Sequence, residues 1–306
     1  MGRCVTAFVF PGLNGAGHPD DYAWMLRLPG FQAHWALVVA AFATTPGFAR
    51  FDAALQAGDE LPRAAPAWSF RALAVAAMQL AAATALERRG EHADWLCGYS
   101  LGDLARSCHA RAATFAQLVA FAAGLPALPC VDGASAAAIT RDHAATTALR
   151  RTLQAVGVAA CRLSPRFVLF AGEPAAMAAA RSAAAAAGAH VRDLGDCPLH
   201  APVLRDTAGM LHVASRGVAM RGACRRMFST LWGRAVTGSD DLRREFTANV
   251  AQPIDFARAV SRLRRRHGVT RFVDLGPGRH ASRFVRHHGT GVHAVHCSEL
   301  LALTAP

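Results

Sequence analysis

One pentapeptide constrains the fold of this chain more than any other stretch: Gly98-Tyr99-Ser100-Leu101-Gly102, a GxSxG pattern in which an apolar run ends. A helical pattern starts directly after it, with residues at i, i+3, i+4 and i+7: Leu101, Leu104, Ala105 and Cys108. Strand, sharp turn and helix in this order put a serine on a tight elbow with its hydroxyl exposed, and the next backbone N–H faces a developing oxyanion. The pattern predicts that Ser100 is a nucleophile; a small-residue turn with a surface serine is the alternative.

Short apolar segments alternate with helical patterns along the chain. Strands are predicted over residues 4–10, 272–275 and 292–297, and a Gly-rich segment follows the first of them. Helices are predicted over residues 71–89 and from the capping box that Thr114 opens. This alternation indicates an α/β fold with a mainly parallel sheet.

A smaller unit is predicted over residues 129–196. Helical and strand patterns alternate within it: helix 144–155, strand 166–171, helix 174–188 and strand 190–194. So short an alternation suggests a ferredoxin-like insertion. The larger domain would then consist of residues 1–128 and 197–306.

Composition and cysteine spacing exclude several classes of protein. The 306 residues are 53% hydrophobic, enough for a large core, but no stretch gives about 18 uninterrupted apolar residues, so we expect no membrane span. The eight cysteines are scattered, mostly in apolar surroundings, without the spacing of a metal site. We therefore expect reduced, buried thiols, a cytoplasmic location and no bound metal.

Arginine alone carries the positive charge of the chain. All 33 basic side chains are arginines, and the net charge is +12. Nine of them fall between Arg258 and His288, a segment with one acidic residue, Asp274. Such a face could meet phosphate groups or an acidic partner, or it could be a solvated helix face. Nucleic acid is not expected, because the aromatic residues are not interleaved with the basic ones and no binding motif is present.

A serine nucleophile needs a base within hydrogen-bond reach and donors for the oxyanion. Fourteen histidines compete for the role of base. His200 stands out because Pro198 and Pro202 flank it and restrict the shape of its loop. By position alone, the other histidines remain alternatives.

Six short stretches, spread over nearly the whole chain, form one ordered set: Phe8–Gly12, Gly98–Asp103, Phe167–Gly172, Cys197–Pro202, Asn249–Pro253 and Asp274–Gly278. Together they resemble the malonyl-CoA:acyl carrier protein transacylase family, which includes the acyltransferase domains of polyketide and fatty acid synthases. The first is similar to its FPGQG loop and the second to its GHSLGE elbow. The third is like a strand of its small subdomain, the fourth contains its catalytic histidine, and the last two are like its C-terminal signatures.

The resemblance implies an α/β-hydrolase-like large domain with an inserted ferredoxin-like small subdomain. It also implies a catalytic dyad in which Ser100 attacks an acyl thioester and His200 is the general base. Backbone N–H groups of Leu13 and Leu101 would stabilise the oxyanion, and the main-chain carbonyl of Asn249 would orient His200 in place of a triad acid.

The implied reaction moves an acyl group between the thioesters of CoA and an acyl carrier protein, in polyketide or fatty acid biosynthesis. The phosphopantetheine arm is then part of the substrate, and no cofactor is bound. Acyl carrier protein and acyl-CoA are the implied partners.

The chain departs from this family in its acyl pocket. Malonyl-selective members carry an arginine that pairs with the substrate carboxylate, and Leu125 stands at that place here. There is no arginine between Arg111 and Arg141. Leucine offers nothing in return for desolvating a carboxylate, so we predict an uncharged acyl group. Leu199 and Tyr99 are the other predicted pocket residues.

Two alternatives to acyl transfer remain open. Water could take the acyl group from the serine, which would make the chain an acyl-thioester hydrolase of the editing kind. The chain could instead be a non-catalytic scaffold that binds carrier protein, although the retained Ser100 and His200 argue against this.

Overall fold

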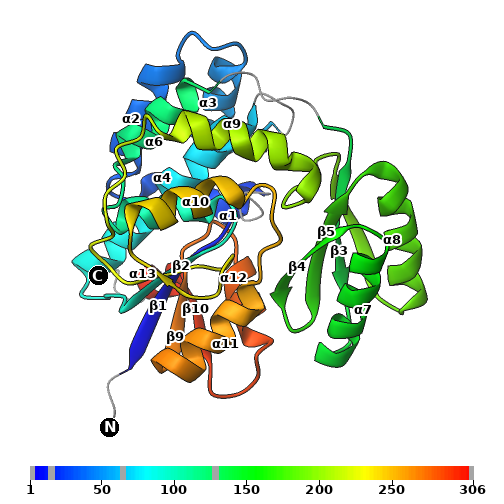
Figure 1. Ribbon diagram of the computed structural model, residues 1–306. Coiled ribbons are helices and arrows are strands. Elements are labelled where there is room, and N and C mark those ends of the chain that lie inside the picture. The colour runs from blue at the N-terminus through cyan, green and yellow to red at the C-terminus, as the bar shows by residue number, and fades with distance from the viewer. Residues whose placement is uncertain (1–3, 13–17, 63–66, 126–130, 303–306) are drawn as a thin grey trace.

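The computed structural model describes residues 4–12, 18–62, 67–125 and 131–302, and contains two sheets (Figure 1). The larger sheet has the strand order β10-β9-β1-β2-β7-β8. Its strands are β1 (Val5–Phe10), β2 (Trp95–Gly98), β7 (Met227–Phe228), β8 (Ala235–Val236), β9 (Val269–Asp274) and β10 (His293–His296). All neighbouring strands pair in parallel except β7 and β8. The predicted mainly parallel sheet is confirmed.

Helices cover both faces of this sheet. They are α1 (Pro19–Tyr22), α2 (Phe31–Phe42), α3 (Phe48–Ala57), α4 (Ala67–Arg88), α5 (Gly102–His109), α6 (Phe115–Ala123), α9 (Arg205–Ser215), α10 (Ser239–Ala248), α11 (Phe256–His267), α12 (His280–Arg286) and α13 (Cys297–Ala302), with 3-10 turns at Ala23–Arg27 and Pro202–Leu204. Side chains alternate along β1, because successive residues of a strand point to opposite faces. Phe8 and Phe10 join the core formed with α2 to α6, whereas Ala7 and Val9 join the core formed with α11 and α12. Burial on both faces is what an α/β sheet requires.

Helix α4 is the central helix of the larger core. By length and composition its segment Trp68–Arg88 could cross a membrane, but 83% of its most apolar window is buried inside the protein. It contacts the neighbouring helices α2 and α5, and its alanines Ala74, Ala77 and Ala81 are fully buried in this core. The helix predicted over residues 71–89 is therefore a core helix.

The smaller sheet is antiparallel, with the strand order β4-β5-β3-β6. Its elements are β3 (Ala134–Ile139), α7 (His143–Ala155), β4 (Ala159–Ser164), β5 (Phe167–Gly172), α8 (Pro174–Ala186) and β6 (His190–Gly195). This βαββαβ order confirms the ferredoxin-like topology. The domain boundaries at residues 129 and 196 remain a prediction.

Two strands of this small sheet were not predicted. The sequence pattern gave a helix–strand–helix–strand unit, which lacks β3 and β4. Both begin with alanines, whose intrinsic preference is for helix. Pairing of β3 between β5 and β6 overrides that preference, and the small side chains of Ala136 and Ala138 fit beneath α7 and α8.

The small subdomain packs against the larger domain through the other face of its sheet. Cys161, Leu163 and Leu169 join the core that lies under α11 and α12. The guanidinium of Arg162 also makes two hydrogen bonds of 3.0 Å to the carboxylate of Asp255, the N-cap residue of α11. These contacts fix the subdomain against the larger domain.

The expectation of buried thiols needs a correction. The seven described cysteines are free. Three are buried as expected: Cys97, Cys161 and Cys297. Three are exposed: Cys4, Cys197 and Cys224. Cys197 is exposed because it follows β6, an edge strand with mostly exposed residues.

Candidate active site

The predicted elbow is present between β2 and α5. The four residues of β2 are all buried, and α5 begins two residues after Ser100. Ser100 has a φ of 55°, in the left-handed region that non-glycine residues seldom adopt. The backbone N–H of Tyr99 donates to the Phe10 carbonyl at 3.1 Å, which ties the elbow to the end of β1. The local strain is therefore maintained by the surrounding sheet.

Glycines make this elbow sterically possible. A Cβ at Gly102 would lie 1.9 Å from the carbonyl oxygen of Phe10, and a Cβ at Gly12 would lie 2.8 Å from the Cβ of Ser100. Real Cβ atoms do not approach other atoms so closely. The two glycines thus let β1 and its loop pass directly beside the serine.

His200 lies within hydrogen-bond distance of Ser100. Its Nε2 is 3.0 Å from the Ser100 Oγ, and its Nδ1 is 2.6 Å from the main-chain oxygen of Asn249. A carbonyl oxygen only accepts, so Nδ1 carries the proton and Nε2 is free to accept from the serine hydroxyl. The structure thus brings together the three predicted residues in the predicted order.

The histidine is itself held in an unusual backbone conformation. His200 has a φ of 61°, and its N–H donates to the Val250 carbonyl at 2.8 Å. Its side chain is buried, with 5% of the residue exposed. Burial lowers the pKa of His200, while its hydrogen bond to Asn249 opposes that shift. The imidazole is therefore neutral at pH 7, as a general base requires.

Of the two predicted oxyanion donors, Leu101 lies within the described residues. Leu101 is the N-cap residue of α5, and among the described residues no acceptor takes its backbone N–H. The group is thus available to an oxyanion beside Ser100, at the positive end of a helix. Leu13 lies outside the described residues.

The three predicted pocket residues occupy different surroundings. Leu125 is half-buried just beyond the end of α6, and Leu199 is half-buried in the loop before His200. The ring of Tyr99 instead packs in the buried core at 4.8 Å from that of Phe256, measured between centroids. The roles of all three in binding an acyl group remain predictions.

A buried polar cluster lies beneath the elbow, and the sequence analysis did not identify it. It consists of Asp103 and Arg106 on α5, Glu245 on α10, and the side chain of Asn249. Asp103 and Arg106 are on the buried face of α5, where an amphipathic helix normally carries apolar residues. Charged residues at positions where the helix pattern calls for apolar ones were the signal in the sequence that could have revealed this cluster.

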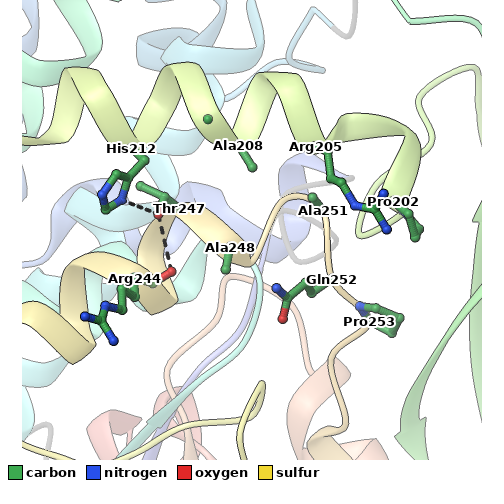
Figure 2. Close-up of a pocket in the computed structure, with 11 residues that line it drawn as sticks. Pro202, Arg205, Ala208, His212, Arg244, Thr247, Ala248, Ala251, Gln252 and Pro253 are labelled. Atoms are coloured by element: carbon green, nitrogen blue, oxygen red, sulfur yellow. Dashed lines mark hydrogen bonds between the residues drawn. The ribbon is translucent and has the colours of Figure 1, made fainter.

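A cleft of about 540 Å³ lies between α9 and α10, beside the loop that carries His200 and the segment that follows Asn249 (Figure 2). Its lining includes the cationic side chains of Arg205 and Arg244, with alanines between them. His212 also lines it, and its Nδ1 is 3.3 Å from the Thr247 hydroxyl. Within the described ranges, no group of three or more His, Cys, Asp or Glu residues is placed to hold a metal ion.

Comparison with known proteins shows which fold this is. No family model matches the chain. A search of curated proteins finds erythronolide synthase EryA2 of Saccharopolyspora erythraea, which is 30% identical over 184 residues. That match covers 59% of this chain and only 5% of the synthase.

Solved structures resemble the chain over nearly its full length. The malonyl CoA-acyl carrier protein transacylase of Coxiella burnetii superposes with a TM-score of 0.81 at 18% identity, covering 98% of this chain and 96% of the transacylase. A malonyl-transacylase in complex with its type II polyketide synthase acyl carrier protein gives a TM-score of 0.78 at 20% identity and covers 95% of each chain. The chain therefore has the transacylase fold, which confirms the predicted fold class.

Proposed function

We propose that this protein is a serine acyltransferase that moves an uncharged acyl group between the thioesters of CoA and an acyl carrier protein. The observation that carries the proposal is the hydrogen-bonded series from Ser100 to His200 to the Asn249 carbonyl. It sits on a fold shared with transacylases that act on acyl carrier protein. Synthesis of a polyketide or fatty acid, in the cytoplasm, is the context that we propose.

The first half of the reaction forms an acyl-enzyme. His200 Nε2 takes the hydroxyl proton while Ser100 Oγ attacks the thioester carbonyl carbon. The oxygen of that carbonyl becomes an oxyanion, to which the backbone N–H of Leu101 and that of Leu13 donate. The carbon–sulfur bond then breaks, and the thiolate takes the proton from His200.

The second half reverses these steps with another thiol. The phosphopantetheine thiol of the carrier loses its proton to His200 and attacks the ester carbon, and Ser100 recovers its proton as it leaves. During both halves the carbonyl of Asn249 accepts from the imidazolium Nδ1–H. A neutral carbonyl stabilises that cation less than a carboxylate would, but it fixes the ring in the same tautomer and orientation.

The preference for an uncharged acyl group rests on the residue at position 125. Leu125 occupies the position at which the resembling family has its carboxylate-binding arginine. The buried guanidinium nearest along the chain is that of Arg106. It donates to the Phe228 carbonyl at 2.9 Å and to the Glu245 carboxylate at 2.6 Å, so both of its terminal nitrogens are already paired inside the protein. A malonyl carboxylate placed against Leu125 would lose water there without gaining a charged partner from that residue.

Donor competition and acceptor assays test this proposal. Purified protein is given equal concentrations of hexanoyl-CoA and malonyl-CoA, and loading of a carrier protein is followed by intact mass. We expect hexanoyl loading to predominate, since a lost charge-assisted pair costs about tenfold or more. Predominant malonyl loading would contradict the assignment of the pocket.

The same assay separates acyl transfer from hydrolysis. Hexanoyl-carrier protein is offered together with an unloaded second carrier, and free hexanoic acid is measured alongside the newly loaded carrier. Transfer that outpaces release of free acid supports an acyltransferase. Free acid that appears first identifies a hydrolase acting through the same acyl-serine.

A further inference from the structure

The buried cluster beneath the elbow places one arginine between two carboxylates. The Nη2 of Arg106 lies 2.6 Å from Glu245 Oε2 and 3.3 Å from Asp103 Oδ1. Asp103, Arg106 and Glu245 are at most 3% exposed. Removing two carboxylates and a guanidinium from water is costly, and the remaining negative charge needs further donors.

Asn249 supplies such a donor and connects the cluster to the catalytic residues. Its Nδ2 donates to Asp103 Oδ2 at 2.7 Å and to the Ser100 carbonyl at 3.1 Å. Its main-chain oxygen is the acceptor for His200 Nδ1. One residue thus contacts the elbow, the buried carboxylate and the base.

The carboxylate of Asp103 is held in one place. A Cβ on Gly98 would lie 2.5 Å from Asp103 Oδ1, so the carboxylate packs directly against the end of β2. Burial raises the pKa of Asp103 to about 7; Arg106 opposes that rise, Glu245 adds to it, and the hydrogen bond from Asn249 opposes it. The bond from Asn249 is therefore one of the interactions that favour the ionised form of this carboxylate.

We propose that Asp103 is a positioning residue for the acylation reaction, acting on His200 through Asn249. Its carboxylate holds the Asn249 side chain, and this keeps the Asn249 carbonyl directed at Nδ1 of His200. In a serine–histidine–aspartate triad the carboxylate contacts the histidine directly. Here the carboxylate of Asp103 would act on the histidine through Asn249. This inference rests on the proposed function, because it concerns the same base and nucleophile.

Kinetics of single and double variants test the inference. The rate constant for acylation of Ser100 by hexanoyl-CoA is measured by rapid-quench intact mass for wild type, Asp103→Ala, Asn249→Ala and the double variant. We expect each single substitution to lower the rate constant by about 10- to 100-fold, since small misplacement of a base has effects of that size, with little change in KM. The double variant should be no slower than the slower single variant, because the two side chains act as one unit.

A matched control separates positioning from stability. Glu245→Gln removes a carboxylate from the same buried cluster but does not touch the Asn249 side chain. We expect it to lower Tm while the acylation rate constant stays within about twofold of wild type. Asp103→Asn, which keeps an oxygen acceptor for Asn249, should recover much of the rate lost in Asp103→Ala.

The outcomes distinguish this inference from the proposed function. If wild-type protein forms no acyl-enzyme, both are wrong. If wild type is acylated and Asp103→Ala reacts at the wild-type rate with only a lower Tm, Asp103 is structural and the inference alone is wrong. Should Asp103→Ala not fold, Asn249→Ala tests the same contact from its other side, and a rate within twofold of wild type would overturn the inference.

Discussion

The two ends of helix α5 share their unusual features but differ in what surrounds them. Ser100 precedes the helix with a φ of 55°, and Arg111 follows it with a φ of 59°. A carboxylate paired with arginine lies near each end: Asp103 with Arg106 at the start, and Glu87 with Arg225 beyond the end. A left-handed backbone conformation and an arginine–carboxylate pair therefore do not by themselves identify a functional site.

The ion pairs at the two ends of α5 differ in their exposure to solvent. Asp103 and Arg106 are sealed beneath the elbow, whereas the side chains of Glu87 and Arg225 are 22% and 31% exposed beside an open cleft of about 470 Å³. Burial raises the pKa of Asp103 to about 7 despite its arginine. Burial also pushes the pKa of Glu87 upward, but hydrogen bonds from His109 and Arg225 outweigh it and lower that pKa to about 2. Similar partners thus shift the two carboxyl pKa values in opposite directions, and only the first end contacts the proposed catalytic base, His200.

Gly102→Ala should have the largest effect, because it disrupts the buried start of α5 beside Ser100. The new Cβ would meet the Phe10 carbonyl oxygen at 1.9 Å, so the elbow must move. We expect the free energy of unfolding to fall by about 3 kcal/mol, by chemical denaturation, and acylation to be lost. Gly209→Ala, in α9 where a Cβ meets nothing within 4 Å, is the control and should retain wild-type stability or exceed it.

The pH dependence of acylation should show the consequence of burying the base. Burial lowers the pKa of His200 from 6.5. His200 accepts a proton only when neutral, so the rate should fall about tenfold per pH unit below a midpoint that lies under 6.5. Protonation of Asp103 near pH 7 should change the rate little, because the protonated carboxyl keeps an oxygen acceptor for Asn249, as Asp103→Asn does. Measured by rapid quench over a series of buffers, a midpoint at or above 6.5 would contradict the structure.

Glu87→Gln tests the partly exposed cluster beyond the C-terminal end of α5, and it should reduce stability less than Gly102→Ala does. A carboxylate with a lowered pKa stabilises the folded state above its unfolded value of 4.5, and that contribution is lost as pH falls toward 2. Because solvent screens this partly exposed cluster, we expect a loss of about 1 kcal/mol at pH 7 that shrinks as the solution is acidified. Glu91→Gln, whose carboxylate contacts the single arginine Arg271, is the control and should cost less. An equal loss at low pH would contradict the assignment.

Arg111→Gly should have the smallest effect. Relief of the left-handed strain, roughly 1 kcal/mol, is offset by the greater freedom of glycine in the unfolded chain, so stability should change by less than about 0.5 kcal/mol. Acylation should be unchanged, because this end meets no catalytic residue. A marked loss of activity would show that the two ends of α5 are coupled.

The sequence predicted those parts of the site that short motifs encode. The GxSxG elbow and the proline-flanked histidine located Ser100 and His200, and the resemblance added the Asn249 carbonyl. The buried cluster was missed because Asp103 and Asn249 lie 146 residues apart, and no local pattern reports such a contact. Strand β3 was missed for a related reason: its alanines favour helix locally, and only pairing with β5 and β6 makes them a strand.

Formation of an acyl-enzyme at Ser100 is the most direct test of the account. Wild-type protein and Ser100→Ala are incubated with hexanoyl-CoA, and their intact masses are compared. We predict one added hexanoyl group on wild type, mapped to Ser100 by peptide mass analysis, and none on the variant. No adduct on wild type, or an adduct that persists in Ser100→Ala, would contradict the claim that the elbow serine is the nucleophile.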